Sequence, residues 1–319
     1  MYTEIVTQLR GGLRGEYLSL LRGCGLEYEA EAEETVLIWD SDRLVATGAR
    51  QEHILKYIAV DPQYQGEGLT ATLLTALKEA VLRAGFRHSF LFTKPGNKFQ
   101  FQSLFFYPIA QTQDVLLMED RKNGITDFLC SLPRPCTSGK IGAAVMNCNP
   151  FTLGHRYLVQ RAAEDCDHLY LFILSEDKSL FSAKDRLEMA RLGTADLPNV
   201  TVLPTGPYLI SSATFPSYFL KDRDKAAAHC DLDIAVFVRH YIPHFGITHR
   251  YVGTEPLSPL TEQYNRALRE QLPIALIELP RLEQEGLPIS ASRVRSLLPH
   301  IQHLVPESTY TYILTHHLY

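Results

Sequence analysis

The pattern of apolar residues changes once along the chain, and this change constrains the fold more than any other sequence feature. Before residue 120, short apolar runs at 36–39, 44–47 and 54–60 follow one another with only polar turns between them, which is typical of antiparallel strands. After residue 140, apolar runs alternate with segments of helical spacing, which is typical of βαβ units and a parallel sheet. We therefore expect two different folds in one chain.

Three residues mark the boundary between the two patterns. Pro133, Pro135 and Gly139 stand among polar residues, where neither a helix nor a sheet continues easily. A chain of 319 residues also exceeds the size at which a single core usually stops growing, about 250–300 residues. We expect a first domain over residues 1–125, a linker over 126–139 and a second domain over 140–319.

The expected fold class is α/β, with an α+β domain followed by a Rossmann-like parallel-sheet domain. In the first domain, helical spacing predicts a helix over 69–84 that ends at Gly85, and later strands are expected at 90–92 and 115–118. In the second domain, the predicted strands are 141–146, 169–174, 200–203, 234–237, 251–253 and 274–277. Ligands of such parallel sheets bind beyond the carboxyl ends of the strands.

Charge and cysteine content exclude several classes of protein. Lys and Arg number 31 against 36 Asp and Glu, so the chain lacks the positive excess that binding to nucleic-acid phosphates requires. The six cysteines form no C-x-x-C pair and offer no zinc-site spacing, so we expect reduced thiols in a cytoplasmic protein. No signal peptide is visible, and no apolar run approaches the roughly 18 residues of a membrane-spanning helix.

A glycine-containing loop follows the predicted strand at 54–60 and directly precedes the predicted helix at 69–84. It contains Gln63, Gln65, Gly66 and Gly68. Glycines let such a loop turn tightly, so that successive backbone N–H groups point at an anion at the helix N-terminus. We interpret the loop as a diphosphate pocket, although two glycines alone are also typical of an ordinary turn.

A second loop of this kind follows the predicted strand at 141–146 and runs from Asn149 to His155. Gly154 permits close approach of a phosphate, and the dipole of the following helix favours negative charge. His155 can donate a hydrogen bond to a phosphate oxygen, and Thr152 supplies a hydroxyl at the same rim. A histidine at a helix start is, taken alone, more often a cap or a surface residue.

Cations and hydroxyls gather at two further predicted helix starts. Lys178 and Arg186 bracket the predicted helix start near residue 182. The alternative interpretation for both residues is that they are solvated charges on the surface. The other, near the C-terminus, carries Ser290, Ser292, Arg293 and Arg295. These groups suit nucleotide phosphates, while N-capping by Ser290 or Ser292 is the simpler alternative.

In its context, the first loop resembles the coenzyme A pyrophosphate loop of the GNAT acetyltransferases, Q/R-x-x-G-x-G/A, and the order of elements over 1–125 fits that fold. The resemblance implies that Gln63, Gln65, Gly66 and Gly68 bind a CoA-type group. The Gly-Phe that this family often carries near its last strands is replaced by Phe-Phe-Tyr-Pro at 105–108, with Tyr107 as a candidate acid–base residue. Binding of a CoA-type group is therefore better supported than acetyl transfer.

Three motifs of the second domain resemble those of the HIGH-motif nucleotidyltransferases, the superfamily of pantetheine-phosphate adenylyltransferase. They are Thr-Leu-Gly-His at 152–155, the segment 178–186, and Ile-Ser-Ala-Ser-Arg-Val-Arg at 289–295. The resemblance implies catalytic roles for His155, Lys178 and Thr152. It implies ATP binding by Asn149, Phe151, Gly154, Arg186, Ser290, Ser292, Arg293 and Arg295.

Over essentially the whole chain, the domain order and the segments 145–158 and 251–256 resemble the citrate lyase ligase family. The resemblance implies an AMP-forming acid–thiol ligase that uses ATP, Mg²⁺ and acetate. Such an enzyme acetylates the thiol of the phosphoribosyl-dephospho-CoA group on the citrate lyase acyl-carrier subunit. The reaction passes through acetyl-adenylate and releases AMP and pyrophosphate.

Other interpretations stay open at this point. One alternative function is that of an adenylyltransferase acting on a phosphate acceptor, and another is that of a CoA-sensing regulatory module. If the chain is a ligase, the carrier protein of malonate decarboxylase is an alternative partner. Cys148 has no adjacent base in the sequence and is interpreted as a buried apolar residue. Asp231 and Asp233 either coordinate Mg²⁺ or lie where a helix ends and a strand begins.

Overall fold

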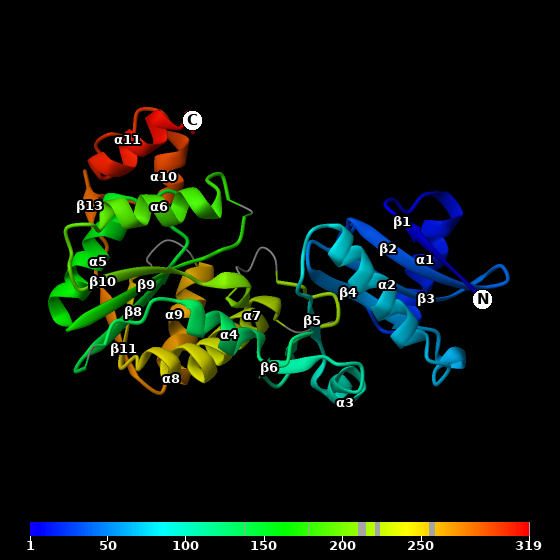
Figure 1. The fold of residues 1–319 in the computed structure, drawn as a ribbon. Helices are drawn as coiled ribbons and strands as arrows, with labels where there is room; N and C mark the ends of the chain where they lie inside the picture. Colours follow the sequence, from blue (N-terminus) through cyan, green and yellow to red (C-terminus); the bar gives the residue numbers. More distant parts are fainter. Residues whose placement is uncertain (137, 178, 210–214, 221–223, 255–258, 319) are drawn as a thin grey trace. The chain divides into compact units, whose positions relative to one another are not determined.

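The computed structural model describes residues 1–136, 138–177, 179–209, 215–220, 224–254 and 259–318. It divides into two compact units (Figure 1). The first contains Met1–Gly124 together with Pro216–Ala228, and the second contains Ile125–Phe215 together with His229–Tyr319. The short segment 216–228 thus comes from the later half of the chain but folds with the first unit.

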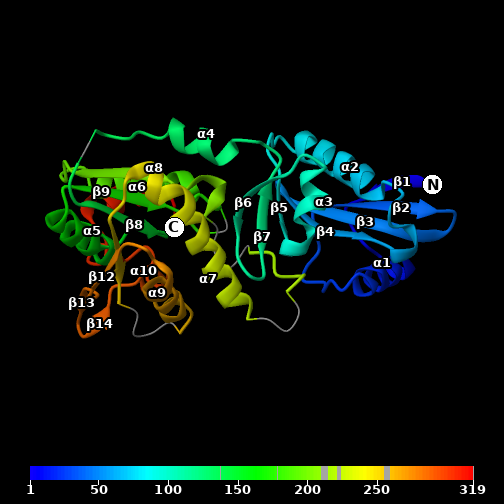
Figure 2. The same cartoon turned by 90° about the horizontal axis from the view of Figure 1, so that it is seen from below.

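The first unit is built on a seven-stranded sheet with the strand order β1-β2-β3-β4-β5-β7-β6. Its strands are β1 (Tyr2–Val6), β2 (Glu34–Asp40), β3 (Arg43–Gln51), β4 (Ile54–Val60), β5 (Phe90–Thr93), β6 (Tyr107–Gln111) and β7 (Leu116–Glu119). Helices α1 (Gly11–Gly23) and α2 (Leu69–Arg83) cover opposite faces of the sheet, and α3 (Lys98–Gln102) follows β5 (Figure 2). The α+β pattern expected for this region is confirmed, including the end of α2 before Gly85, whose φ is +90°.

The only parallel pair in this sheet, among the described residues, is β4 with β5, and it is short. Pairing covers Ile54 with Phe90 and Leu55 with Leu91 and then stops. Directly afterwards, β4 carries an irregularity against β3, and Tyr57 has a φ of +54°. Bulges of this kind bend a strand and interrupt its ladder, so β4 turns away from β5 towards their carboxyl ends.

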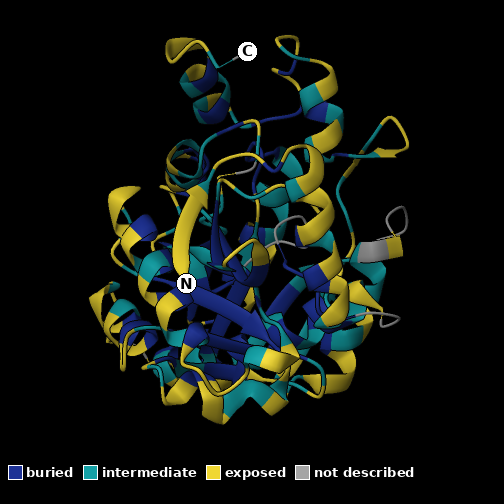
Figure 3. Ribbon diagram, turned by 90° about the vertical axis from the view of Figure 1, so that its right-hand side faces the viewer, coloured by how far each residue is buried: buried dark blue, intermediate teal, exposed yellow. Residues whose placement is uncertain are grey.

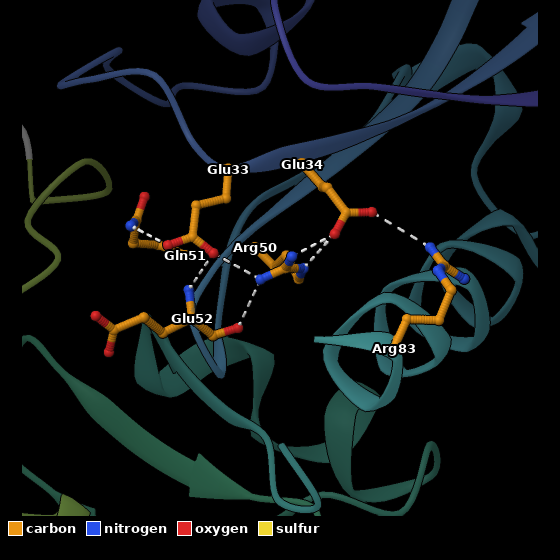
Figure 4. A network of polar contacts seen from close by, with 6 residues as sticks. All are labelled: Glu33, Glu34, Arg50, Gln51, Glu52 and Arg83. Carbon is orange, nitrogen blue, oxygen red and sulfur yellow. Dashed lines mark hydrogen bonds and ion pairs between the residues drawn. The ribbon is translucent and has the colours of Figure 1, made fainter. Parts of the chain in front are cut away.

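A polar network around Arg50 joins the start of β2 to the end of β3 (Figure 4). The Arg50 guanidinium lies 2.7 Å from Glu33 and donates from Nε to Glu34 at 2.8 Å. Arg83 of α2 reaches the other oxygen of Glu34 at 3.3 Å. Burial alone would raise the pKa of the Glu34 carboxyl, but the two arginines outweigh it and hold that pKa below its usual value. The network therefore ties α2 to the start of β2.

The second unit is built on a five-stranded sheet with the order β10-β9-β8-β11-β12, and all of its pairs are parallel. Its strands are β8 (Ile141–Met146), β9 (His168–Ile173), β10 (Val200–Pro204), β11 (His249–Gly253) and β12 (Ala275–Leu279). The chain winds outward in both directions from the centre, so the order reverses between β8 and β11. In such sheets the crevice at the carboxyl ends of the central strands is the usual ligand site.

Helices and a small hairpin surround this sheet. The helices are α4 (Gly124–Ser131), α5 (Leu153–Asp165), α6 (Ala183–Gly193), α7 (Lys225–Val236), α8 (Ile242–Phe245), α9 (Pro259–Gln271), α10 (Ala291–Ser296) and α11 (Glu307–Thr315), and the hairpin joins β13 (Glu283–Gln284) to β14 (Leu287–Pro288). Helix α4 occupies the first part of the stretch expected to be a linker. Burial is concentrated in the strands, with exposed residues on the outer faces of the helices (Figure 3).

One predicted strand is wrong. Residues 234–237 form the end of α7 and the start of a π-helical turn, Phe237–Tyr241. The run is apolar because Ile234, Val236 and Phe237 are buried, and periodicity alone does not separate a short buried strand from a buried piece of helix. The expected parallel-sheet fold is otherwise confirmed. None of the described helices is both long and apolar enough to cross a bilayer.

Candidate functional site

The loop before α2 presents backbone groups rather than side chains. Gly66 and Gly68 have φ values of +92° and +77°, and a Cβ atom at either position would meet nothing within 4 Å. Gly68 is the N-cap of α2, and no side chain caps this helix start. Uncapped N–H groups at a helix N-terminus are a ready site for an anion.

This loop opens into a cavity of about 750 Å³ inside the first unit. The cavity lies where β4 and β5 part, and Gln65, Gly66 and Gly68 are among the residues that line it. Its size falls in the range of small-molecule sites, about 300–1,000 Å³. Gln63 does not line it, because its side chain accepts a hydrogen bond from Arg43 at 3.0 Å. Tyr107, at the start of β6, is also not part of the lining.

In the second unit, the loop after β8 is fixed by a capping box between Thr152 and His155. The Thr152 hydroxyl accepts from the His155 backbone N–H at 3.3 Å, and the Thr152 backbone N–H donates to His155 Nδ1 at 3.0 Å. Here histidine takes the place that Glu or Gln fills in an ordinary capping box. The His155 ring also stacks on Phe151, with centroids 5.9 Å apart.

The protonation state of His155 follows from these contacts. Burial and the nearby positive charge of Arg281 lower its pKa to about 4, so the ring is neutral at pH 7. Because Nδ1 accepts from the Thr152 N–H, the proton of the neutral ring is on Nε2. His155 therefore offers an oriented, uncharged N–H donor rather than an acid.

The residues before Thr152 are tied to the surrounding loops. Asn149 is buried; its side-chain oxygen accepts from the Phe181 N–H at 3.1 Å, and its backbone carbonyl accepts from Arg295 at 2.6 Å. Phe151 is fully buried and packs so closely on α6 that a Cβ at Gly193 would lie 2.5 Å from its ring. Cys148 is also buried, and burial raises the pKa of its thiol, in keeping with the apolar role expected for it.

Arg186 is fully buried, although the sequence placed it among the phosphate-binding candidates. Its guanidinium donates to the backbone carbonyls of Phe181, Asn147, Leu174 and Glu176 and to the Asn147 side chain. These acceptors belong to the loops that follow β8 and β9. The side chain thus holds the two loops together from within, and its role in ATP binding stays a prediction.

The start of α10 meets the start of α5. A Cβ at Gly154 would lie 2.6 Å from the Ile289 carbonyl oxygen, so glycine is needed for this close approach. Ser290 caps α10 by accepting from the Arg293 N–H at 3.2 Å. Arg295 donates to the Asn149 carbonyl and, at 3.2 Å, to the exposed Ser292 hydroxyl.

The structure thus brings most of the described ATP-binding candidates together, and the exceptions are Arg186, which is buried, and Arg293. The Arg293 guanidinium points to the β13–β14 hairpin, where the carbonyls of Gln284 and Leu287 lie 3.4 Å away. Lys178 lies outside the described residues.

Arg281 is a site residue that sequence reasoning missed. It lies two residues after the end of β12, and its Nε donates to the Thr254 carbonyl at 2.7 Å, directly after β11. Its charge also acts on His155. The available signal was its position beyond the carboxyl end of a predicted strand, since that edge of a parallel sheet carries the ligand site.

The described residues do not form a resident metal centre. No group of three His, Cys, Asp or Glu side chains is placed to hold an ion anywhere in the described ranges. Asp233 is buried on α7 and accepts from the Tyr264 hydroxyl at 2.6 Å, and burial raises the pKa of its carboxyl. Asp231 accepts from Gln271. These two aspartates therefore do not fit Mg²⁺.

Comparison with known proteins now places the chain. Residues 141–313 match the family model described as the citrate lyase ligase C-terminal domain, and residues 13–101 match that of the acetyltransferase (GNAT) family. The chain belongs to the citrate lyase ligase family. It is 43% identical over 309 residues to the [citrate [pro-3S]-lyase] ligase of Klebsiella pneumoniae, covering 92% of this chain and 90% of that protein.

Two further relatives carry the same name. The chain is 38% identical to the Escherichia coli (strain K12) protein, covering 93% of this chain and 89% of that one. It is 37% identical to the Haemophilus influenzae protein, covering 86% and 87% respectively. The expected family is thereby confirmed, as is the expectation that the chain is a ligase with a GNAT-like first domain.

Proposed function

We propose that this protein uses ATP and acetate to acetylate a thiol on the acyl-carrier subunit of citrate lyase, with acetyl-adenylate as the intermediate. The thiol belongs to a phosphoribosyl-dephospho-CoA prosthetic group. The names of the relatives support citrate lyase as the target. The single observation that carries the chemistry is the neutral, oriented His155 at the junction of α5, α10 and the loop after β8.

In the first half-reaction, an acetate oxygen attacks the α-phosphorus of ATP and the bond to the β-phosphate breaks. Pyrophosphate leaves, and acetate is joined to AMP as a mixed anhydride. Negative charge moves on to phosphate oxygens, and fixed donors that need no reorganisation stabilise it. His155 Nε2–H supplies such a donor, and the start of α5 adds its backbone dipole.

Other residues of the site position this donor. Thr152 fixes the His155 tautomer, and Arg295 holds the Asn149 carbonyl. The positive charge of Arg281 adds to the attraction for phosphate and, together with burial, which is the larger cause, lowers the pKa of His155 so that the ring is neutral. Ser292 is exposed beside Arg295 and can reach a bound anion. When Mg²⁺ enters with ATP, it screens phosphate charge, and its ligands would come mainly from ATP.

In the second half-reaction, the thiol loses its proton and its sulfur attacks the acetyl carbonyl. The C–O bond to AMP breaks, and a thioester and AMP form. The prosthetic arm contains a pyrophosphate and a pantetheine chain. The cavity of the first unit supports binding of this arm, since Gly66 and Gly68 suit the pyrophosphate and the space between β4 and β5 suits a thin chain.

We also infer a reducing compartment, the cytoplasm, because the thiols of Cys130 and Cys136 are exposed and reduced.

Two isotope measurements test the proposal. Full-length protein with ATP and labelled pyrophosphate is expected to exchange label into ATP only when acetate is present. With labelled acetate and deacetylated citrate lyase, label is expected in the acyl-carrier subunit. Exchange that requires a phosphomonoester instead of acetate would point to a nucleotidyltransferase. Tight CoA binding without any ATP turnover would point to a regulatory module, and label entering only the malonate decarboxylase carrier would change the partner.

A further inference from the structure

The wall of the cavity includes two residues from the later half of the chain. Tyr218 and Phe219 line the cavity together with residues of β4, β5 and α1. The Tyr218 hydroxyl donates to the Phe92 carbonyl at 3.3 Å, and the Tyr218 carbonyl accepts from the Glu27 N–H at 2.7 Å. Tyr218 is 5% exposed. It is therefore bonded into the first unit at both its side chain and its backbone.

Tyr218 lies at the point where the two central strands part. The last paired residues are Leu55 and Leu91, and Phe92, which accepts from Tyr218, comes directly after Leu91. The ring of Tyr218 lies 4.7 Å from that of Tyr57, just beyond Leu55 on β4. The glycine loop follows the carboxyl end of β4. Tyr218 thus stands at the opposite end of the split from the proposed pyrophosphate site.

The space behind Tyr218 is filled by other tyrosine rings. Tyr57 has Tyr17 at 6.4 Å and Tyr28 at 6.0 Å, measured between ring centroids. Tyr17 and Tyr57 are fully buried, and neither lines the cavity. The neighbouring carboxylate, Glu29, accepts two hydrogen bonds from Ser217 and lies 3.7 Å from the Lys56 ammonium. Among the described residues, these side chains occupy the space next to Tyr218 on the side away from the cavity.

The cavity also lacks the chemistry that an amine acceptor needs. At neutral pH an amine is protonated and must lose a proton before it attacks a thioester. None of the described residues that line the cavity carries a carboxylate or an imidazole. Burial raises the pKa of the Cys24 thiol and of the Tyr218 phenol, so neither is a base at pH 7.

We propose that the first unit holds a CoA-type arm without transferring an acyl group, that Tyr218 fixes how far the arm enters the cavity, and that the arm leaves the cavity before its thiol attacks acetyl-adenylate. This inference rests on the proposed function for the identity of the arm. It goes beyond that function in two ways. It assigns the GNAT-like unit to binding alone, and it names a positioning residue outside the loop that carries the family resemblance.

Calorimetric titration of the full-length protein with CoA, acetyl-CoA and octanoyl-CoA tests the proposal. CoA and acetyl-CoA are expected to bind with similar affinity, because two carbons fit before the tyrosine ring. Octanoyl-CoA is expected to bind at least about tenfold more weakly, since its six further carbons meet that ring. Tyr218→Ala is expected to bring octanoyl-CoA to within about threefold of CoA by removing the ring.

Two further variants separate this effect from a loss of folding. Tyr218→Leu keeps an apolar side chain but shortens it, so it should relax selectivity even if Tyr218→Ala does not fold. Tyr57→Phe is the matched control. It removes the phenol hydroxyl of Tyr57, which donates to the Ala30 carbonyl. Tyr57 belongs to the same tyrosine cluster as Tyr218 but does not line the cavity. It should leave the ratio of CoA to octanoyl-CoA affinity at the wild-type value.

The possible failures are distinguishable. If wild-type protein bound no CoA at all, the assignment of the arm to this cavity would be wrong, and the inference would fall with it. If CoA bound but octanoyl-CoA bound equally well, or if neither Tyr218 variant changed the ratio, the inference alone would be wrong. Transfer of acetyl from acetyl-CoA to spermidine by wild-type protein would also overturn it. Unaltered acetyl-CoA in that assay supports it.

Discussion

The two loops that sequence reasoning assigned to phosphates have opposite constructions. In the loop before α2, Gly66 and Gly68 have left-handed backbones and open space around them, and no side chain caps the helix. In the loop before α5, Thr152 and His155 cap each other, and Gly154 touches the Ile289 carbonyl. The first loop offers backbone donors, and a ligand that is only bound there does not need to be positioned with great accuracy. The second fixes the position of one donor, and in the proposed function this donor lies where charge develops.

The largest effect is expected from His155→Gln. Glutamine is a normal capping-box residue at this position, so the cap on α5 should persist while the Nε2–H donor is lost. Acetate-dependent ATP–pyrophosphate exchange should fall by about 10²–10³, the usual effect of removing one preorganised donor. Thermal unfolding should change little. Full exchange activity in a folded His155→Gln protein would show that this loop, like the first, does not depend on one accurately positioned side-chain donor.

Gly154→Ala should have the next largest effect. The new Cβ would lie 2.6 Å from the Ile289 carbonyl oxygen, so α5 and α10 must move apart. Overpacking of this kind destabilises by about 1–3 kcal/mol, and exchange should fall because the two halves of the ATP site separate. Denaturant unfolding and the exchange assay measure the two consequences. An alanine variant as stable and active as wild type would mean that the contact between the helices is not needed.

Gly66→Ala is the counterpart in the first loop. There is room for the Cβ, so only the left-handed backbone is penalised, at about 1–2 kcal/mol. The expected result is weaker CoA binding in calorimetry, by about tenfold if the loop relaxes to avoid a strain of this size. Exchange without the carrier reports only on the second loop. A Gly66→Ala protein that lost exchange but kept CoA affinity would reverse the roles given to the two loops.

The smallest effect concerns pH. The pKa of His155 is about 4 in the folded protein and near 6.5 in an unfolded chain. The unfolded state therefore binds more protons between pH 6.5 and 4, so this group's contribution to stability is present above pH 6.5 and is lost as the pH falls to 4. The melting temperatures of wild type and His155→Gln should be similar at neutral pH and should separate over that window as the pH is lowered, with wild type becoming the less stable protein. Parallel curves would indicate a histidine with an ordinary pKa.

Features that depend on neighbours in sequence could be predicted. Both loops lie at strand–helix junctions, and the junctions were predictable because glycine, capping residues and apolar periodicity act locally. Ser182 and Ser290 cap their helices as their positions indicate. The family resemblance also pointed to residues that the fold brings together, such as Asn149 and Arg295.

Features that are set by tertiary packing could not be predicted from the sequence. Arg186 was a candidate phosphate ligand because it is cationic, but its burial among carbonyls from two loops depends on packing. Residues 234–237 were placed in a strand because a buried helix end and a buried strand have the same composition. Arg281 and Tyr218 carry no local pattern. Their positions depend on where β12 and the segment 216–228 lie in the folded units.

Because residues 216–228 belong to the first unit, the chain cannot be cut between its two halves without removing part of that unit. A fragment that stops near residue 139 would lack Tyr218 and Ser217, which leaves the Phe92 carbonyl and the Glu29 carboxylate without the donors they have here. A gene rearrangement that replaced the later half of the chain would also remove Tyr218 and Phe219 from the wall of the cavity in the first unit. The first unit is thus completed only when the later half of the same chain has been synthesised.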